Sequence, residues 1–192
     1  WTTTPWTLPS NLALAVNPNL SYVYVRDLDS QQVWVVAERC LANVYPVKKR
    51  KEQASAPLTY EILKKVQGAE LVGKSYEPIF PYFKDHKKAF QILSSEHVTS
   101  EDGTGVVHQA PAFGEDDFYT CRAHGIEIVD PLDESACFTS AVKDYQGQYI
   151  KDADKSICSD LKKQGKLVRQ DTVVHSYPFD ERTDTPLIYK AV

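Results

Sequence analysis

Residues 103–117 read GTGVVHQAPAFGEDD, and this stretch says more about the fold than any other in the chain. A Gly-x-Gly turn leads into a short apolar run, which predicts a buried strand over residues 106–109. A loop with proline and glycine follows. Three carboxylates then open a helix over residues 114–124, where the helix dipole favours negative charge, and Gly125 closes it. Such a loop can bring His108 and a carboxylate at the helix start to opposite sides of one small cavity.

The opening residues 1–11 read WTTTPWTLPSN. Three threonines before Pro5 favour an edge strand that ends in a turn, because proline donates no hydrogen bond to a sheet. Threonine is common in strands, so this segment by itself favours a purely structural interpretation. The hydroxyls and the freed backbone groups must nevertheless face something polar.

Elsewhere, short β-rich runs alternate irregularly with helical runs. Further strands are expected at residues 12–16, 22–26, 33–37, 76–80, 90–93 and 166–170, and further helices at residues 38–44, 58–66 and 152–164. The polar residues 48–57 are expected to form a loop. Because the strands and helices do not alternate as βαβ units, the pattern predicts an α+β fold with a barrel-like β core and inserted helices.

The composition is that of a globular protein with one sizeable core: 192 residues, 42% of them hydrophobic and 25% charged. The net charge of −4 argues against broad nonspecific binding of nucleic acid. Local basic clusters can still touch phosphates, although each is expected to be a solvated surface; they lie at residues 48–51, 84–88 and 162–163. No apolar run approaches the ~20 residues that span a bilayer, so no membrane is expected as a partner.

Four cysteines are widely spaced, and no Cys-x-x-Cys pair occurs. This pattern predicts neither a zinc site nor a disulfide framework, and reduced thiols in the cytoplasm are the expectation. The chain lacks methionine and begins inside a strand-like segment, which suggests a piece of a longer protein.

Taken together, residues 1–11 and 103–117 resemble two signatures of the editing domain of isoleucyl-tRNA synthetase, the connective peptide 1 insertion of a class I synthetase. The related valyl and leucyl enzymes usually have Thr-Thr-Arg-Pro in the first segment, so Thr-Thr-Thr-Pro-Trp indicates the isoleucyl branch. Residues 71–80 and 175–178 are also similar to that branch, and the resemblance covers essentially the whole chain. At Asp180 and Glu181 the chain departs from the family's Cys-Trp, so no role is transferred to them.

The resemblance implies that residues 1–192 form a single editing domain cut from a larger synthetase. Its expected activity is hydrolysis of misacylated valyl-tRNA(Ile), and of valyl-adenylate. The sequence lacks the family's amino-acid activation motifs, so no ligase activity is expected from this chain alone. The site residues carried over from the family are Thr2, Thr3, Thr4 and Asp117 as catalytic residues, and Trp6, Asn11 and His108 as substrate-binding residues.

Each of these residues has an implied role in selection or hydrolysis. Burying one methylene is worth only ~0.8 kcal/mol, so attraction alone separates isoleucine from valine poorly. A second site too small for isoleucine solves the problem, and isoleucyl-tRNA synthetase is itself the standard example of such double-sieve editing. His108, with Trp6, is implied to exclude the larger side chain. Asp117 is implied to anchor the α-ammonium group. No Ser-His-Asp constellation is evident, which favours direct attack by an oriented water.

The implied partners are the tRNA(Ile) acceptor end carrying valine and the rest of the synthetase, in a monomeric enzyme. No cofactor or metal is expected in this domain, whereas the full-length enzyme is expected to use ATP and Mg²⁺. Two other classes stay open. One is a module that binds the tRNA acceptor end without catalysis. The other is a metal-dependent hydrolase that combines His108 with one of the carboxylates at residues 115–117, although no His-x-x-x-His spacing supports it.

Overall fold

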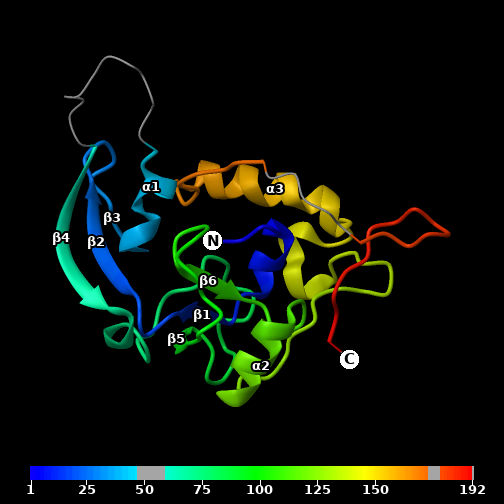
Figure 1. Cartoon of the computed structure of the whole chain (residues 1–192). Coiled ribbons are helices and arrows are strands. Elements are labelled where there is room, and N and C mark those ends of the chain that lie inside the picture. The colour runs from blue at the N-terminus through cyan, green and yellow to red at the C-terminus, as the bar shows by residue number, and fades with distance from the viewer. Residues whose placement is uncertain (47–58, 173–177, 192) are drawn as a thin grey trace. The chain divides into compact units, whose positions relative to one another are not determined.

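Two units make up the fold, and the computed structural model describes residues 1–46, 59–172 and 178–191 of them (Figure 1). Unit 1 consists of Trp1–Thr2, Ala13–Tyr76 and Gln91–His108, and unit 2 consists of Thr3–Leu12, Glu77–Phe90 and Gln109–Val192. Each unit is described by itself. The assignment of residues 1–192 to a single editing domain stays a prediction. The expected loop at residues 48–57, and most of the segment at residues 175–178, lie outside the described residues.

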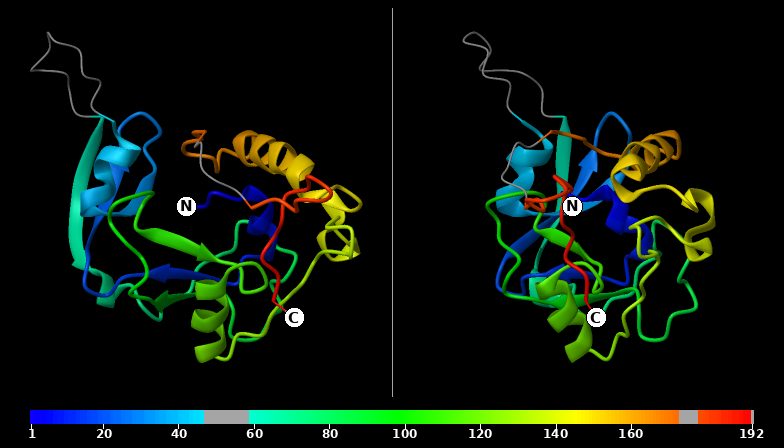
Figure 2. Two further views of the ribbon diagram at one scale, coloured as in Figure 1. Left: turned by 45° about the vertical axis from the view of Figure 1, so that its right-hand side comes forward. Right: turned by 90° about the vertical axis from the view of Figure 1, so that its right-hand side faces the viewer.

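An antiparallel sheet in unit 1 places β2 (Ser21–Asp27) between β3 (Val33–Ala37) and β4 (Tyr60–Gln67). Figures 1 and 2 show the three strands side by side. The β2 sequence SYVYVRD is rich in β-branched and aromatic residues, which suit a pleated surface. A turn stabilised by Asp27 follows β2: one carboxylate oxygen accepts hydrogen bonds from the backbone N–H and the hydroxyl of Ser30, both at 2.7 Å.

The helix expected at residues 58–66 is wrong, because this segment forms strand β4. Its backbone pairs with β2 from Ser21↔Gln67 to Asp27↔Tyr60, with a bulge between Tyr24 and Val25. The spacing of leucine, isoleucine and valine suits a helix, but most of these side chains are exposed, so no helical face is buried. The hydrogen bonds to the edge of β2 therefore outweigh the local propensity.

A second sheet has the order β5-β1-β6 and consists of β1 (Ala13–Val16), β5 (Gln91–Ser94) and β6 (Val106–Gln109). β1 runs parallel to β5. All three strands lie where the sequence predicts them, to within one residue at their ends. The described strands thus form two three-stranded sheets and no closed barrel. The α+β class is confirmed, and the barrel-like core is not.

Unit 1 buries an apolar cluster on its antiparallel sheet. At its centre lies Tyr22, which is fully buried and donates its hydroxyl hydrogen to the carbonyl of Gly105 at 2.7 Å. The same hydroxyl accepts a hydrogen bond from the backbone N–H of Asn17 at 3.0 Å. Burial raises the pKa of this phenol, so it stays protonated and keeps its donor. The cluster consists of Val16, Tyr22, Val23, Val25, Val36, Ala37, Cys40, Val66 and Leu71.

Unit 2 contains the two longer helices, α2 (Glu115–Ala123) and α3 (Ile150–Lys163). Each ends at a glycine with positive φ, Gly125 and Gly165, as the sequence predicts. The residue after each glycine donates its backbone N–H to a carbonyl in the last turn of the helix, which closes a Schellman motif. The helix boundaries therefore follow from local sequence.

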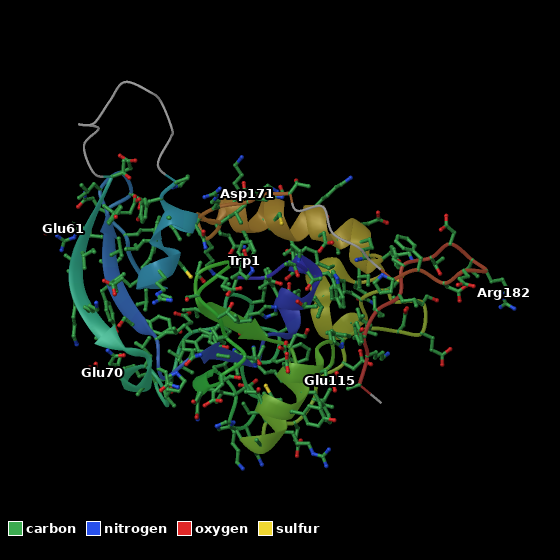
Figure 3. All side chains as sticks on the ribbon, in the orientation of Figure 1. Trp1, Glu61, Glu70, Glu115, Asp171 and Arg182 are labelled. Atoms are coloured by element: carbon green, nitrogen blue, oxygen red, sulfur yellow. The ribbon has the colours of Figure 1, made fainter. Side chains whose placement is uncertain are left out.

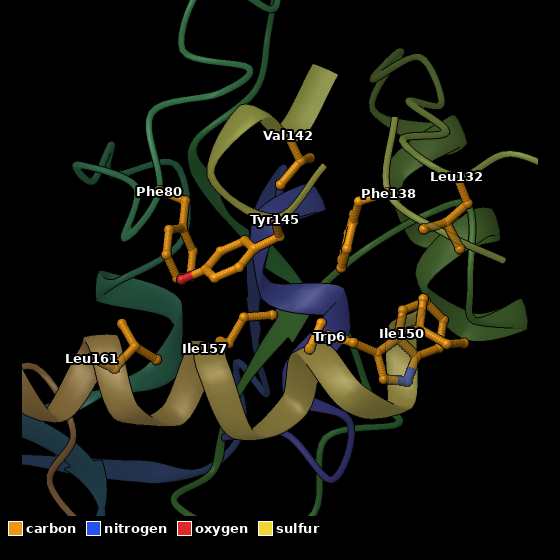
Figure 4. Close-up of a cluster of buried hydrophobic side chains, with 10 residues drawn as sticks. Trp6, Phe80, Leu132, Phe138, Val142, Tyr145, Ile150, Ile157 and Leu161 are labelled. Atoms are coloured by element: carbon orange, nitrogen blue, oxygen red, sulfur yellow. The ribbon is translucent and has the colours of Figure 1, made fainter. Parts of the chain in front are cut away.

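The core of unit 2 packs against the apolar face of α3 (Figure 4). Ile150, Ala153, Ile157 and Leu161 recur at helical spacing on that face and are buried. Aromatic rings fill the space beside them: the ring centroid of Tyr145 lies 6.1 Å from that of Phe80 and 6.2 Å from that of Phe138. Trp6, from the opening segment of the chain, is part of this core.

Two expected strands are wrong. The strand expected at residues 76–80 does not form: the segment includes Pro78, which cannot donate to a sheet, and Phe80 lies in the core of unit 2. Residues 166–170 follow the end of α3 and form no strand in the described structure, and Val168 is exposed. The helix expected at residues 38–44 is confirmed as two short pieces. The short elements are η1 (Pro5–Ser10), η2 (Glu38–Cys40), α1 (Leu41–Val44), η3 (Gly68–Glu70) and η4 (Ser140–Tyr145).

None of the described helices has both the length and the apolar character needed to cross a membrane.

Candidate active site

The Thr-rich opening segment forms the 3-10 helix η1 in unit 2, so the edge strand favoured by the sequence is wrong. Pro5 is the first residue of η1, where a missing N–H costs nothing and the ring pre-sets φ. The carbonyl of Thr4 accepts two hydrogen bonds from Thr7, from the backbone N–H at 3.0 Å and from the hydroxyl at 2.8 Å. Thr3, just before this turn, is exposed.

Trp6 fixes the turn in the core of unit 2. Its side chain is 4% exposed, and its ring meets that of Phe113 edge to face, with centroids 4.8 Å apart. The indole N–H is buried and has no hydrogen-bond partner among the residues that the structure describes. The Trp6 backbone N–H donates to Oδ1 of Asp154 at 2.8 Å.

Asp154 is a residue that the sequence analysis misses. It lies on α3 beside the buried Ala153 and one turn after Ile150, in the middle of an otherwise apolar face. Burial raises the pKa of its carboxyl group, while the bond from Trp6 and the charge of Lys151 act in the opposite direction. An acidic residue within an apolar helical stripe is the signal that could have found it.

Asn11 ends the Thr-rich turn and is buried. Its backbone N–H donates to the carbonyl of Leu8 at 3.1 Å. The next residue, Leu12, donates to the carbonyl of Gln109 at 3.0 Å and accepts from the N–H of Phe90 at 2.6 Å. The first signature segment is therefore joined to the second within unit 2, both by these backbone bonds and by the Trp6–Phe113 contact.

Asp117 is the third residue of α2, and its carboxylate closes the loop that precedes the helix. Oδ2 accepts a hydrogen bond from the backbone N–H of Ala110 at 2.8 Å. Gly114 lies directly beneath the carboxylate: a Cβ there would come within 3.0 Å of Cγ of Asp117. Glu115 and Asp116 are exposed in the first turn of α2, where negative charge complements the helix dipole (Figure 3).

His108 is in β6, in unit 1, and is buried. Burial lowers the pKa of its imidazole to about 3, with a smaller contribution from the positive N-terminal amine. The ring is therefore neutral at physiological pH. A buried neutral imidazole presents shape and one N–H donor, and it does not repel an ammonium group as a cation would.

The Gly-Thr-Gly turn in unit 1 is held by close packing and by a backbone hydrogen bond. A Cβ on Gly103 would lie 2.6 Å from the Trp1 ring, and a Cβ on Gly105 would lie 2.3 Å from Cβ of Ala37. Both glycines have positive φ. The carbonyl of Thr104 accepts the backbone N–H of Ala37 at 2.8 Å. These contacts explain why the sequence has glycine at both positions.

The predicted site residues are thus divided between the units. Thr2 and His108 belong to unit 1, and the others belong to unit 2: Thr3, Thr4, Trp6, Asn11 and Asp117. The residues in unit 2 lie on two segments that the structure brings into contact. A cavity of about 310 Å³ in unit 1 is lined by residues 19–21, 37–39 and 100, and none of these is a predicted site residue.

Two further features of the sequence have local explanations. Asp180, at the departure from the family pattern, accepts hydrogen bonds from the backbone N–H groups of Arg182 at 2.8 Å and Thr183 at 2.9 Å. It thereby stabilises the turn that includes Arg182, which is labelled in Figure 3. In the part of the chain that the structure describes, no three His, Cys, Asp or Glu side chains gather as a metal site would require.

Known structures share this fold, whereas no family model matches the chain. The structure described as GlLeuRS-CP1 superposes with a TM-score of 0.59 and 15% identity, over 92% of this chain and 82% of that one. The editing domain of the P. knowlesi cytosolic leucyl-tRNA synthetase superposes with a TM-score of 0.59 and 17% identity, over 86% and 80%. The fold is that of a class I aminoacyl-tRNA synthetase editing domain.

Sequence relatives show to which synthetase family the chain belongs. Across its full length the chain is 54% identical to the isoleucine–tRNA ligase of Bdellovibrio bacteriovorus. The identity is 53% to the ligase of Corynebacterium diphtheriae and 48% to that of Chlamydia trachomatis serovar L2. The chain belongs to the isoleucine–tRNA ligase family, and it spans about 18% of the length of these relatives.

Proposed function

We propose that this chain is an editing hydrolase that cleaves the ester of valyl-tRNA(Ile) and also hydrolyses valyl-adenylate. The observation that carries the proposal is the contact between the two signature segments in unit 2. Trp6 packs against Phe113 at 4.8 Å, and Leu12 bonds to Gln109 at 3.0 Å. The relatives named isoleucine–tRNA ligase and the structures named editing domains support it.

Asp117 anchors the α-ammonium group of the valyl moiety. A carboxylate has two oxygens and about four lone-pair sites, so it can accept the Ala110 N–H and an ammonium group together. The bond to Ala110 also fixes the direction of the carboxylate before substrate arrives. Anchoring of this kind places the ester carbonyl where a water can attack it, which lowers the entropic part of the barrier.

His108 sets the size limit. Because its ring is buried and neutral, it acts as a wall of fixed shape against the amino-acid side chain. Exclusion by a wall is asymmetric: valine fits, and isoleucine, larger by one methylene, does not. The resemblance implies that Trp6 binds substrate too, but its side chain is 4% exposed in the core of unit 2, so its role is to hold the Thr-rich turn rather than to touch the substrate.

Thr2, Thr3 and Thr4 contribute hydroxyl and backbone groups to the terminal adenosine, the ester and the attacking water, and Asn11 supports the peptide that carries them. Hydrolysis proceeds by direct attack of water, assisted by the neighbouring ribose hydroxyl, without a covalent enzyme intermediate. Backbone donors stabilise the oxyanion.

In the cell, the partners are the acceptor end of tRNA(Ile) and the remainder of a monomeric cytoplasmic synthetase. ATP and Mg²⁺ serve the synthetic site of that larger enzyme, and the editing domain itself uses neither.

The decisive experiment compares two neighbouring carboxylates. In a deacylation assay with valyl-tRNA(Ile), we expect Asp117→Ala to lower kcat/KM by about 100-fold, since misplacing the reacting group by about 1 Å costs on this order. Asp116→Ala is the matched control, because Asp116 is exposed in the same helical turn, and its activity should stay within about twofold of wild type. The wild-type chain should not hydrolyse isoleucyl-tRNA(Ile).

Undiminished hydrolysis by Asp117→Ala would contradict the anchoring role. Binding of valyl-tRNA(Ile) without turnover, weakening steeply with salt, would favour the binding module instead. Activity abolished by a chelator and restored by a divalent metal would favour the metal-dependent hydrolase.

A further inference from the structure

Asp154 makes a contact that the proposed reaction does not explain. A helix leaves its first backbone N–H groups without partners inside the helix, and a side chain near the start usually accepts one of them. In η1 the side chain of the N-cap residue, Thr4, makes no such capping bond. Pro5 has no N–H, and the N–H of Thr7 is taken by Thr4. The N–H of Trp6 is instead accepted by Asp154 at 2.8 Å, from a helix 148 residues further along the chain.

The position of Asp154 on α3 is energetically unfavourable for a carboxylate. The neighbouring positions on this face, Ile150, Ala153 and Ile157, are fully buried and apolar (Figure 4). Burial of the carboxyl group disfavours its charged form. An alanine or leucine here would continue the apolar stripe, so the stability of α3 does not require an acid. The bond to Trp6 is what the acid provides.

We infer that Asp154 is a positioning residue for ester hydrolysis, which sets the direction in which η1 presents Thr3 and Thr4. This inference rests on the editing function proposed above. Thr3 and Thr4 come directly before η1, and Thr4 has a non-helical backbone with φ of −130° and ψ of 82°. Their hydroxyls and carbonyls are therefore aimed by the turn that follows. Asp154 holds the backbone of that turn, and the Trp6 ring holds its side chain by packing in the core of unit 2 and against Phe113.

The geometry separates this role from catalysis itself. Asp154 bonds to the backbone of Trp6 rather than to a threonine. Losing the bond should therefore shift the threonines without removing a reacting group. A shift of about 1 Å in a group near the reacting atoms can cost about 100-fold in rate. The loss should appear mainly in kcat, because the remainder of the substrate still binds.

The test uses three variants of the full chain. Asp154→Ala removes the acceptor, Asp154→Asn keeps an acceptor oxygen and removes the charge, and Asp152→Ala removes an exposed carboxylate from the same helix as a control. Two quantities are measured for each: kcat and KM for deacylation of valyl-tRNA(Ile), and the hydrogen exchange rate of the Trp6 amide by NMR.

For Asp154→Ala we expect kcat to fall about tenfold to 100-fold with KM changed less than about threefold, and the Trp6 amide to exchange about tenfold faster. Asp154→Asn should restore both quantities to within about threefold of wild type, because its side-chain oxygen accepts the same bond. Asp152→Ala should leave both unchanged.

Three results would overturn the inference: an unchanged Trp6 amide in Asp154→Ala, faster exchange with no loss of kcat, or failure of Asp154→Asn to rescue. If Asp154→Ala does not fold, Asp154→Asn is compared with wild type instead. Because Asp154→Asn keeps an acceptor oxygen, loss of its hydrolytic activity would then contradict the inference. If the wild-type chain itself fails to hydrolyse valyl-tRNA(Ile), the proposed function fails, and the Trp6 exchange rates still decide whether Asp154 holds η1.

Discussion

Residues 103–105 and residues 110–117 belong to one continuous segment, but different interactions hold its two parts. In unit 1, the turn at residues 103–105 passes so close to its neighbours that a Cβ on Gly105 would lie 2.3 Å from the Cβ of Ala37. In unit 2, the carboxylate of Asp117 closes the loop by accepting the N–H of Ala110 at 2.8 Å. Close packing fixes the first part, and a hydrogen bond to a carboxylate fixes the second. Under the proposed function, only the second restraint also orients a group that binds substrate, the Asp117 carboxylate.

Substituting Gly105 with alanine should have the largest effect on this comparison. The new Cβ collides with Ala37, and the residue must also keep a φ of +70°. Overpacking and left-handed strain together should cost about 3 kcal/mol in the free energy of unfolding, measured by urea denaturation. Gly73→Ala is the matched control: its φ is +80°, but nothing lies within 4 Å of its Cβ. It should cost only about 1 kcal/mol. Equal losses would mean that the backbone angle alone, and not the close packing, holds the turn.

Between these two parts lies His108, whose burial makes stability depend on pH. Its pKa is about 3 in the folded chain, against 6.5 for an exposed imidazole, so the unfolded chain binds one more proton between these values. Stability should therefore fall as the pH drops below 6.5. The contribution of His108 at pH 5, relative to pH 8, should be a loss of about 2 kcal/mol, at 1.36 kcal/mol per pH unit.

His108→Gln removes this titration and is the reference for the measurement. The difference in free energy of unfolding between wild type and His108→Gln should change with pH from 8 to 5 by the amount given above. A difference that stays constant over this range would show that the imidazole is not buried in its neutral form.

Substitutions of Asp117 should change the free energy of unfolding least. They also separate its two roles, which are holding the loop and anchoring the ammonium group. Asp117→Ala leaves the N–H of Ala110 without its acceptor and should cost about 1.5 kcal/mol. Asp117→Asn keeps an acceptor and should cost about 0.5 kcal/mol. In the deacylation assay, however, the asparagine variant should be impaired almost as much as the alanine variant, because an amide does not pair with an ammonium group. Full activity of Asp117→Asn would assign Asp117 to the loop alone.

Sequence patterns predict the parts of the fold whose causes are local. β3 and β6 have the expected bounds, and α2 and α3 end before Gly125 and Gly165 as expected. A strand of β-branched residues or a glycine with positive φ needs no distant partner to be recognised. β4 fails for the opposite reason: its residues suit a helix, and only pairing with β2 makes them a strand.

The candidate site divides in the same way. The resemblance to a family identifies the two signature segments, and their contact in unit 2 agrees with it. Sequence alone misses the 3-10 turn at Pro5–Ser10, because threonine propensity favours a strand. It also misses Asp154 and the bond from the Ala110 N–H to Asp117, since both depend on where a side chain lies after folding. For Asp154, the one local signal in the sequence is an acidic residue within an apolar helical stripe.

The bond between Trp6 and Asp154 also imposes an order in time. Ribosomes add about 5–20 residues per second, so the 148 residues between the two partners take roughly 7 to 30 s to synthesise. During that interval the Thr-rich peptide has emerged but lacks both its hydrogen-bond acceptor and the helix face on which Trp6 packs. Contacts so far apart in sequence form late in folding. The peptide proposed to handle the substrate is thus made well before the helix that holds it, and it takes its final shape only after that helix, so a nascent chain should have no hydrolytic activity until α3 is in place.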